Sequence, residues 1–166
     1  MPSLSGLRRR AGAAPERVVP LDLSVKWAPN DPQAVLITLD DGATVLGLEP
    51  HHDDLDRRCV VVRWGGSQLS LSSPPNDEAI RGHRLYSAGL NSVTWAGDVV
   101  NSELIRAMEK QNRVHSHHDP ARFEKLRHHV VLTKERVFEV VAETVSVDRV
   151  EAPTTLEAAQ RSIARR

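Results

Sequence analysis

The chain has 166 residues, of which 40% are hydrophobic and 27% are charged, as in globular proteins that bury a core. The 22 lysine and arginine residues balance the 22 aspartate and glutamate residues, so net charge favours neither nucleic acid nor an anionic membrane as a partner. A single cysteine, Cys59, excludes a disulfide within the chain and any metal site built from several cysteines. These features predict a cytoplasmic protein.

The first 17 residues include a run of three arginines, at positions 8–10, among glycine, alanine and proline. No apolar run follows those arginines, so the segment does not have the pattern of a signal peptide. No part of the chain has the ~20 apolar residues of a membrane span. We predict a disordered basic tail over residues 1–17 and a single α+β domain over residues 18–166.

The N-terminal third of this domain carries strand patterns. Residues 19–27 alternate apolar and polar side chains, which is typical of a half-buried strand. The next apolar segment is interrupted by Asp41-Gly42, the favoured pair for a two-residue hairpin turn. Closing a hairpin at that pair places Ile37 opposite Leu46 and leaves one face almost wholly apolar.

A second hairpin is predicted over residues 59–73. Gly65-Gly66 is its turn, which places Val62 opposite Leu69. Two hairpins in succession favour a mainly antiparallel sheet. Further strands are predicted, because of their valine content, over residues 93–100, 129–134 and 137–147.

Capping residues mark the predicted helices. The longest of them runs from about residue 102 to 113, and its apolar residues are expected to form a buried stripe: Leu104, Ile105, Ala107 and Met108. The predicted caps are Asn76 for a short helix that Gly82 stops, Asn101 or Ser102 for the longest helix, Asp119 before Pro120, and Thr154 for a C-terminal helix.

Strands, then helices, then strands again, with a terminal helix, indicate an α+β domain. We predict a mainly antiparallel sheet built from hairpins, with two or three helices packed on one face and a C-terminal helix. The strands at 129–134 and 137–147, together with the first strand, leave apolar surface and unpaired backbone. We therefore also predict a homodimer.

Five of the eight histidines lie within residues 112–129. The H-x-H-x-D pattern at 115–119 resembles the first part of the metallo-β-lactamase zinc motif, HxHxDH. Pro120 stands where that family has histidine, and no histidine follows His129, so we exclude the family. A separate zinc site, completed by His128 or His129 and a carboxylate, stays open as an alternative.

The run NDEAIRGHRLYSAGL (76–90), followed by NRVHSHHD (112–119), is similar to stretches of small bacterial proteins in which NDEA…GHxL…NxVHxxHD recurs. The similarity covers residues 75–143, and Ser116 stands where proline is expected. No function is known for those proteins, so the resemblance implies none. It draws attention to Asn76, Asp77, Glu78, His83, Asn112, His115, His118 and Glu139.

Histidine is the usual proton carrier at neutral pH. We predict that His115 or His118 is a catalytic base and that Glu139, on an apolar strand face, orients it. A glutamate on such a face is either exposed at a sheet edge or buried with a partner, and exposure is the more common outcome. The predicted substrate-binding residues are His83, Tyr86 and Asn112.

The leading hypothesis is a small-molecule enzyme of hydrolase, lyase or isomerase type, with or without a metal, whose cofactor is unknown. It requires His83, His115 and Glu139 to converge on one cavity. The alternative is a non-catalytic module that binds a protein or forms a homodimer. The segment His-His-Asp-Asp at 51–54 has a metal-like composition but is typical of a solvated loop between hairpins.

Overall fold

The computed structural model describes residues 14–30 and 33–165. Over those residues the chain forms nine strands, three α-helices and two 3₁₀-helices. The strands are β1 (Arg17–Pro20), β2 (Val35–Thr38), β3 (Thr44–Leu48), β4 (Cys59–Gly65), β5 (Leu69–Ser73), β6 (Ala96–Val100), β7 (Arg127–Leu132), β8 (Val137–Ala142) and β9 (Thr144–Val150). The helices are η1 (Asp77–Gly82), η2 (Leu90–Ser92), α1 (Glu103–Asn112), α2 (Pro120–Glu124) and α3 (Thr155–Ile163).

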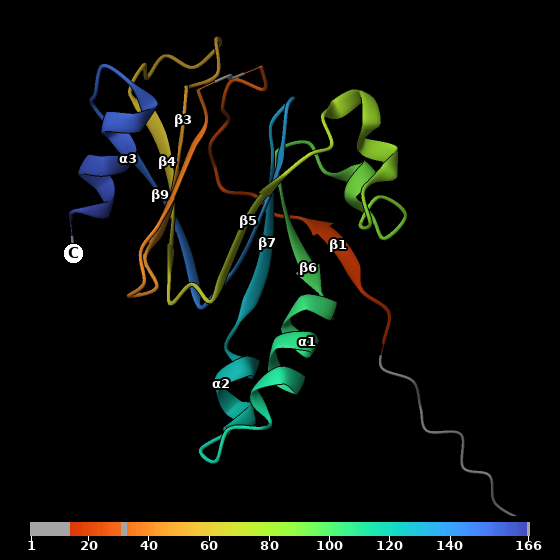
Figure 1. Cartoon of the computed structure of the whole chain (residues 1–166). Coiled ribbons are helices and arrows are strands. Elements are labelled where there is room, and N and C mark those ends of the chain that lie inside the picture. The colour runs from red at the N-terminus through yellow and green to blue at the C-terminus, as the bar shows by residue number, and fades with distance from the viewer. Residues whose placement is uncertain (1–13, 31–32, 166) are drawn as a thin grey trace, which may run out of the picture.

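The strands form two antiparallel sheets that face each other (Figure 1). One sheet has the strand order β1-β6-β7-β8-β5, and the other has the order β2-β3-β4-β9. The helix α3 covers the outer side of the four-stranded sheet, and the segment that contains η1 and η2 packs on the outer side of the five-stranded sheet. The predicted α+β class is confirmed, with two sheets in place of one.

The main core lies between the two sheets. Leu46 of the four-stranded sheet is buried there with Phe138 and Val140 of the five-stranded sheet. Trp27, from the segment after β1, is fully buried in the same core, and its Nε1 donates a hydrogen bond to Leu132 O at 2.8 Å. Trp27 therefore ties the N-terminal segment both to the core and to the end of β7.

The second predicted hairpin is wrong, although β4 and β5 are consecutive strands. β4 pairs with β3 and β9, whereas β5 pairs with β8 in the other sheet. Gly66 has a φ of +64°, and Ser67 N–H donates to Gly42 O, so the chain turns away from β4 instead of folding back on it. The chain makes a similar change of sheet at Glu143, where the predicted strand 137–147 divides into β8 and β9.

Two other strand predictions need correction. The first hairpin forms, but Ile37 pairs with Val45 and not with Leu46, because the turn spans residues 39–43. Of the predicted strand 19–27, only its start lies in a strand, β1, which pairs with β6. Residues 21–26 form no strand, and Ser24 among them has a left-handed φ of +56°, but their apolar side chains still pack on the main core.

The predicted helix caps are confirmed. Asn76, Ser102, Asp119 and Thr154 each accept a hydrogen bond from a backbone N–H in the first turn of the helix that follows. The buried stripe predicted for residues 102–113 is wrong, since α1 has no buried residue. The reason is its position: α1 and α2 project beyond the ends of β6 and β7 (Figure 1).

The helix α3 packs closely on the four-stranded sheet because Gly47 of β3 has no side chain. A Cβ at that position would lie 2.5 Å from the backbone oxygen of Thr155, so any larger residue would push the helix away. Arg63 of β4 holds the other end of the helix, with hydrogen bonds of 2.9 Å to Ser162 Oγ and to Arg165 O. The two contacts fix α3 along the sheet.

Most of the predicted tail, residues 1–17, lies outside the described residues. Within its described part, Arg17 begins β1 and Glu16 forms an ion pair with Arg84. Ordered structure therefore begins before residue 18. No helix in the described part of the chain is long and apolar enough to span a membrane.

The strand order removes the reason given for a dimer at β7 and β8. Each of these strands has a hydrogen-bonded neighbour on both sides, so their backbone is not free to pair with another chain. The edge strands are β1 and β5 in one sheet and β2 and β9 in the other. Homodimerisation itself stays a prediction.

Candidate functional site

Glu139 lies near the middle of β8, and its side chain is only 4% exposed. It faces the outer side of the five-stranded sheet and is paired with Val130 of β7. Three side chains surround its carboxylate: His83, Arg84 and His128. Glu139 is therefore buried with partners, and the expected exposure of this residue is wrong.

His128 lies on β7, two residues before Val130, and so projects from the same face as Glu139 on the neighbouring strand. The ring is fully buried, and its Nε2 lies 3.0 Å from Glu139 Oε2. On the opposite side of the ring, Nδ1 lies 2.8 Å from Ser102 Oγ. His128 thus links a hydroxyl to a carboxylate inside the protein.

Ser102 reaches His128 because of the turn between β6 and α1. Asn101 takes a left-handed φ of +58° there, a conformation that asparagine tolerates better than most residues. Ser102 then caps α1, and its Oγ accepts a hydrogen bond from Ile105 N–H at 3.2 Å. The cap fixes the position of the hydroxyl oxygen.

Two further residues approach Glu139 from the segment after η1. His83 Nε2 lies 3.5 Å from Glu139 Oε1, and Arg84 forms an ion pair with Glu139 Oε2. Arg84 also lies 2.8 Å from the carboxylate of Glu16, which accepts a hydrogen bond from Glu103 N–H at 2.7 Å. The network therefore connects the residue before β1, the segment after η1, the neighbouring strands β7 and β8, and α1.

These contacts keep Glu139 ionised. Burial alone raises the pKa of its carboxyl group, but the hydrogen bond from His128 and the charge of Arg84 outweigh burial and hold the pKa below its ordinary value. Burial lowers the pKa of His83, and the attraction of Glu139 offsets only part of that effect. Burial also lowers the pKa of His129, which projects from the opposite face of β7 to His128.

Hydrogen bonds indicate which ring nitrogens carry protons. Leu85 N–H donates to His83 Nδ1 at 3.3 Å, so the proton of the neutral His83 ring lies on Nε2, toward Glu139. Nε2 of His128 also faces the Glu139 carboxylate and therefore carries a proton. In a neutral His128 ring, Nδ1 then accepts the proton of the Ser102 hydroxyl. The arrangement can raise the nucleophilicity of Ser102.

A cavity of about 720 Å³ borders this pair, and both Ser102 and His128 line it. Apolar, basic and acidic side chains from both helices and the adjoining strands form much of the remaining wall: Val99, Ile105, Phe123, Leu126, Arg106, Arg127, Asp98 and Glu124. A serine, a histidine and a carboxylate in series beside a cavity are the groups that nucleophilic catalysis requires.

The structure does not bring the other predicted catalytic residues to Glu139. His115 is exposed, and its Nδ1 accepts a hydrogen bond from His117 N–H at 3.0 Å. His118 lies 3.0 Å from the carboxylate of Glu109 on α1. The prediction that Glu139 orients His115 or His118 is therefore wrong, and the required convergence of His83, His115 and Glu139 does not occur.

The predicted substrate-binding residues are also dispersed. His83 contacts Glu139, but Asn112 lies in the other cluster, where its Oδ1 is 2.9 Å from His118 Nδ1. Tyr86 is half buried, and its backbone N–H donates to His83 O in the turn after η1. These positions separate the histidines of 115–118 from the buried network.

Sequence reasoning missed Ser102 and Arg84 as site residues and considered His128 only as a metal ligand. One signal was available for His128. A hairpin with its turn at residues 133–136 pairs Val130 with Glu139, which makes His128 a diagonal neighbour of Glu139 on one face. For Ser102, the capping pattern predicted a role at the start of the helix. It gave no sign of the contact between Ser102 and His128.

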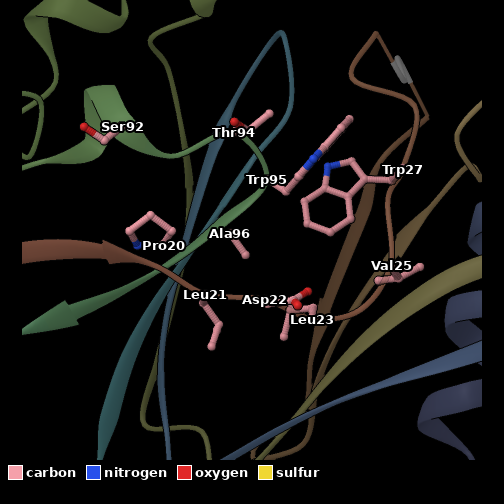
Figure 2. A pocket seen from close by; sticks show the side chains of 10 residues that line it. All are labelled: Pro20, Leu21, Asp22, Leu23, Val25, Trp27, Ser92, Thr94, Trp95 and Ala96. Carbon is pink, nitrogen blue, oxygen red and sulfur yellow. The ribbon is translucent and has the colours of Figure 1, made fainter.

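A second cavity lies at the opposite end of β6 and has a different character. Figure 2 shows this cleft, of about 310 Å³, with Trp27 and Trp95 at one side and Leu21 and Leu23 along another. Among the residues that line it, Asp22 is the one ionisable side chain. The cleft can hold an apolar group but has no pair of residues for acid/base chemistry.

Comparisons with protein-family models, with curated proteins and with solved structures give no match to this chain. A proposal for its function therefore rests on the geometry of the buried network and on the cavity beside it.

Acid should destabilise the protein in two steps. The pKa values of His83 and His129 are lowered in the folded state, so below about 6.5, where an unfolded histidine titrates, the unfolded chain binds more protons. The free energy of unfolding should therefore fall as the pH drops below that value. Glu139, whose folded pKa is also lowered, adds stability that is lost as the pH falls further, below about 4.3.

Urea unfolding between about pH 8 and about pH 2.5 measures both steps. His129→Gln should reduce the first step, whereas His115→Ala, at an exposed histidine, should leave the profile unchanged. A urea midpoint that stays constant from about pH 7 to about pH 5 would contradict the expected effect of the buried histidines.

Proposed function

We propose that the protein is a hydrolase of small esters or related acyl compounds, with Ser102 as nucleophile and His128 as general base. The observation that carries the proposal is the chain of hydrogen bonds from Ser102 Oγ through His128 to Glu139, with Ser102 and His128 on the wall of one cavity. The proposal narrows the earlier hypothesis, an enzyme that uses histidine acid/base chemistry, to one reaction class and one pair of residues.

In the first half of the reaction, Ser102 Oγ attacks the acyl carbon and its proton passes to His128 Nδ1. Glu139 stabilises the imidazolium that forms, because Nε2–H already donates to its carboxylate. His128 then returns the proton to the leaving alcohol, and an ester remains on Ser102. In the second half, His128 takes a proton from water, the water oxygen attacks that ester, and the acid leaves as the proton returns to Ser102.

The first turn of α1 supplies groups that can stabilise the developing oxyanion. The N–H groups of Glu103 and Ile105 are already bonded to side chains, whereas that of Leu104 has no acceptor among the described residues. Arg106, in the same helix, lines the cavity. A backbone N–H and a guanidinium beside the nucleophile are suited to stabilise negative charge in the transition state.

The cavity lining favours substrates with a compact apolar group. Phe123, Leu126 and Ile105 offer apolar surface on the walls. Burial of an apolar acyl or alkoxy group there contributes binding free energy of about 25 cal/mol per Å² before the costs of association.

A fluorophosphonate probe, which reacts with activated serines, tests the proposal. It should form an adduct on the peptide that contains Ser102, detected by mass spectrometry, and the protein should hydrolyse p-nitrophenyl butyrate. Ser102→Asn should abolish the adduct and lower the hydrolysis rate at least about 100-fold. Asparagine is also a good helix cap, so this variant removes the hydroxyl while it retains a capping side chain.

The control is Ser116→Ala, which removes an exposed serine from the loop after α1 and should change neither labelling nor hydrolysis. Thermal melts establish that each variant is folded. An adduct elsewhere, or unchanged hydrolysis by folded Ser102→Asn, would contradict the proposal. The network would then act in stability alone, and the non-catalytic module would become the better hypothesis.

A further inference from the structure

A compact group of two histidines and an aspartate, residue types that serve as metal ligands, lies in the connection between β3 and β4, outside the proposed acyl-transfer site. One ligand atom each of His51, His52 and Asp53 lies within 4.8 Å of the other two. Among residues 14–30 and 33–165, no other set of three histidine, cysteine or acidic side chains meets that condition. The histidines of the loop at 115–118 do not form such a group.

The distances between these atoms are close to those between ligands of one zinc ion. Zinc binds nitrogen and oxygen at about 2.0–2.1 Å in a tetrahedron, which places two ligand atoms about 3.3 Å apart. In the structure, His52 Nε2 lies 3.2 Å from Asp53 Oδ1, and His51 Nδ1 lies 3.7 Å from Asp53 Oδ2. These separations, one to each oxygen of Asp53, are compatible with all three side chains binding one ion.

His51 is held in place before any ion binds. Its side chain is 15% exposed, and its ring packs edge-on against Trp95, with the ring centroids 5.7 Å apart. Asp54 N–H donates to His51 O at 2.9 Å and closes the turn. An ordered ligand lowers the entropy cost of binding. The ion would replace the long hydrogen bond, 3.2 Å, that His51 Nδ1 accepts from Asp53 N–H.

The pairing of neighbouring charges leaves Asp53 available for a cation. Arg149 forms an ion pair with Asp54, and Arg58 forms one with Asp56 at 2.7 Å. Among the described residues, the carboxylate of Asp53 contacts only the two histidine rings. Two neutral imidazoles and one carboxylate are a ligand set that zinc accepts.

The group opens onto a cavity of about 640 Å³, which His51 and Asp53 line together with Trp95 and Leu55. Three protein ligands leave a fourth tetrahedral position for water or another ligand. We propose that His51, His52 and Asp53 bind one zinc ion whose fourth coordination position faces this cavity. Trp95 also lines the apolar cleft in Figure 2, so a molecule bound to the ion would lie beside apolar surface.

Isothermal titration calorimetry of the full chain, purified without a histidine tag, with zinc chloride tests the proposal. We expect about one ion per chain. His52→Ala and Asp53→Asn should each weaken zinc affinity at least about tenfold. Both side chains are largely exposed, 78% and 77%, so neither substitution should disturb the fold.

The matched control is the double variant His115→Ala with His117→Ala, which removes two exposed histidines from another loop and should keep the wild-type affinity. No binding at micromolar zinc, or wild-type affinity in both His52→Ala and Asp53→Asn, would overturn the proposal. Loss of binding in the control would overturn it as well, because the ion would then lie at 115–118. The readout does not depend on Ser102.

Discussion

Replacement of Glu139 with alanine should lower the free energy of unfolding by about 3–5 kcal/mol, because the substitution removes the acceptor from a buried set of donors. His128 Nε2–H and the Arg84 guanidinium both contact Glu139 Oε2, and His83 lies near Oε1. His128 is fully buried, so its N–H would remain without a partner and without water. Loss of the carboxylate thus adds a desolvation cost to the lost attraction.

Two further variants test whether the negative charge of Glu139 and its buried position account for this loss of stability. Glu139→Gln keeps one acceptor oxygen but turns an NH₂ group toward another donor, so we expect a smaller loss of about 1–3 kcal/mol. Glu143→Ala, at an exposed glutamate just after β8, should change stability by no more than about 0.5 kcal/mol. Urea unfolding followed by circular dichroism compares the three. Equal losses for Glu139→Ala and Glu143→Ala would mean that the network contributes nothing to stability.

Trp27→Ala should also cost about 3–5 kcal/mol, the usual range for loss of a large buried aromatic side chain. The indole is fully buried among residues of both sheets, and its Nε1 donates to Leu132 O. The substitution therefore leaves a cavity in the main core and an unpaired carbonyl at the end of β7.

Trp27→Phe keeps most of the apolar volume and removes the donor, so its expected cost is smaller, about 1–2 kcal/mol. Trp95→Ala is the matched control, because Trp95 packs edge-on against Trp27 but is only partly buried. Urea midpoints should rank Trp27→Ala below both other variants. If Trp95→Ala were as destabilising as Trp27→Ala, burial in the main core would not explain the effect.

Local signals in the sequence predicted where helices and strands lie better than they predicted which strands pair. The caps Ser102, Asp119 and Thr154 were predictable because capping involves residues within a single helical turn. The partner of β5 was not, since Gly65-Gly66 is compatible with a tight hairpin and also with a change of sheet. The outcome depends on β8, which comes much later in the chain.

The candidate site was predictable in part for the same reason. Glu139 was recognisable because it interrupts an apolar strand face, but whether it is exposed depends on what packs over that face. The density of histidines at 115–118 indicated a site that the structure does not support, because neighbours in a loop can point in different directions. Ser102 and His128, from separate segments, meet only through the turn at Asn101 and the strand order.

The packing of α3 and β9 has a consequence for how the chain folds during synthesis. β9 pairs with β4, and α3 packs on β2, β3 and β4, so the four-stranded sheet joins residues near 35 to residues near 163. Contacts of such long sequence separation form slowly. The sheet is completed only after residues 144–163 have left the ribosome, and until then Val45 and Val61 remain uncovered. We therefore expect the nascent chain to expose during that interval an apolar surface of the kind that chaperones bind.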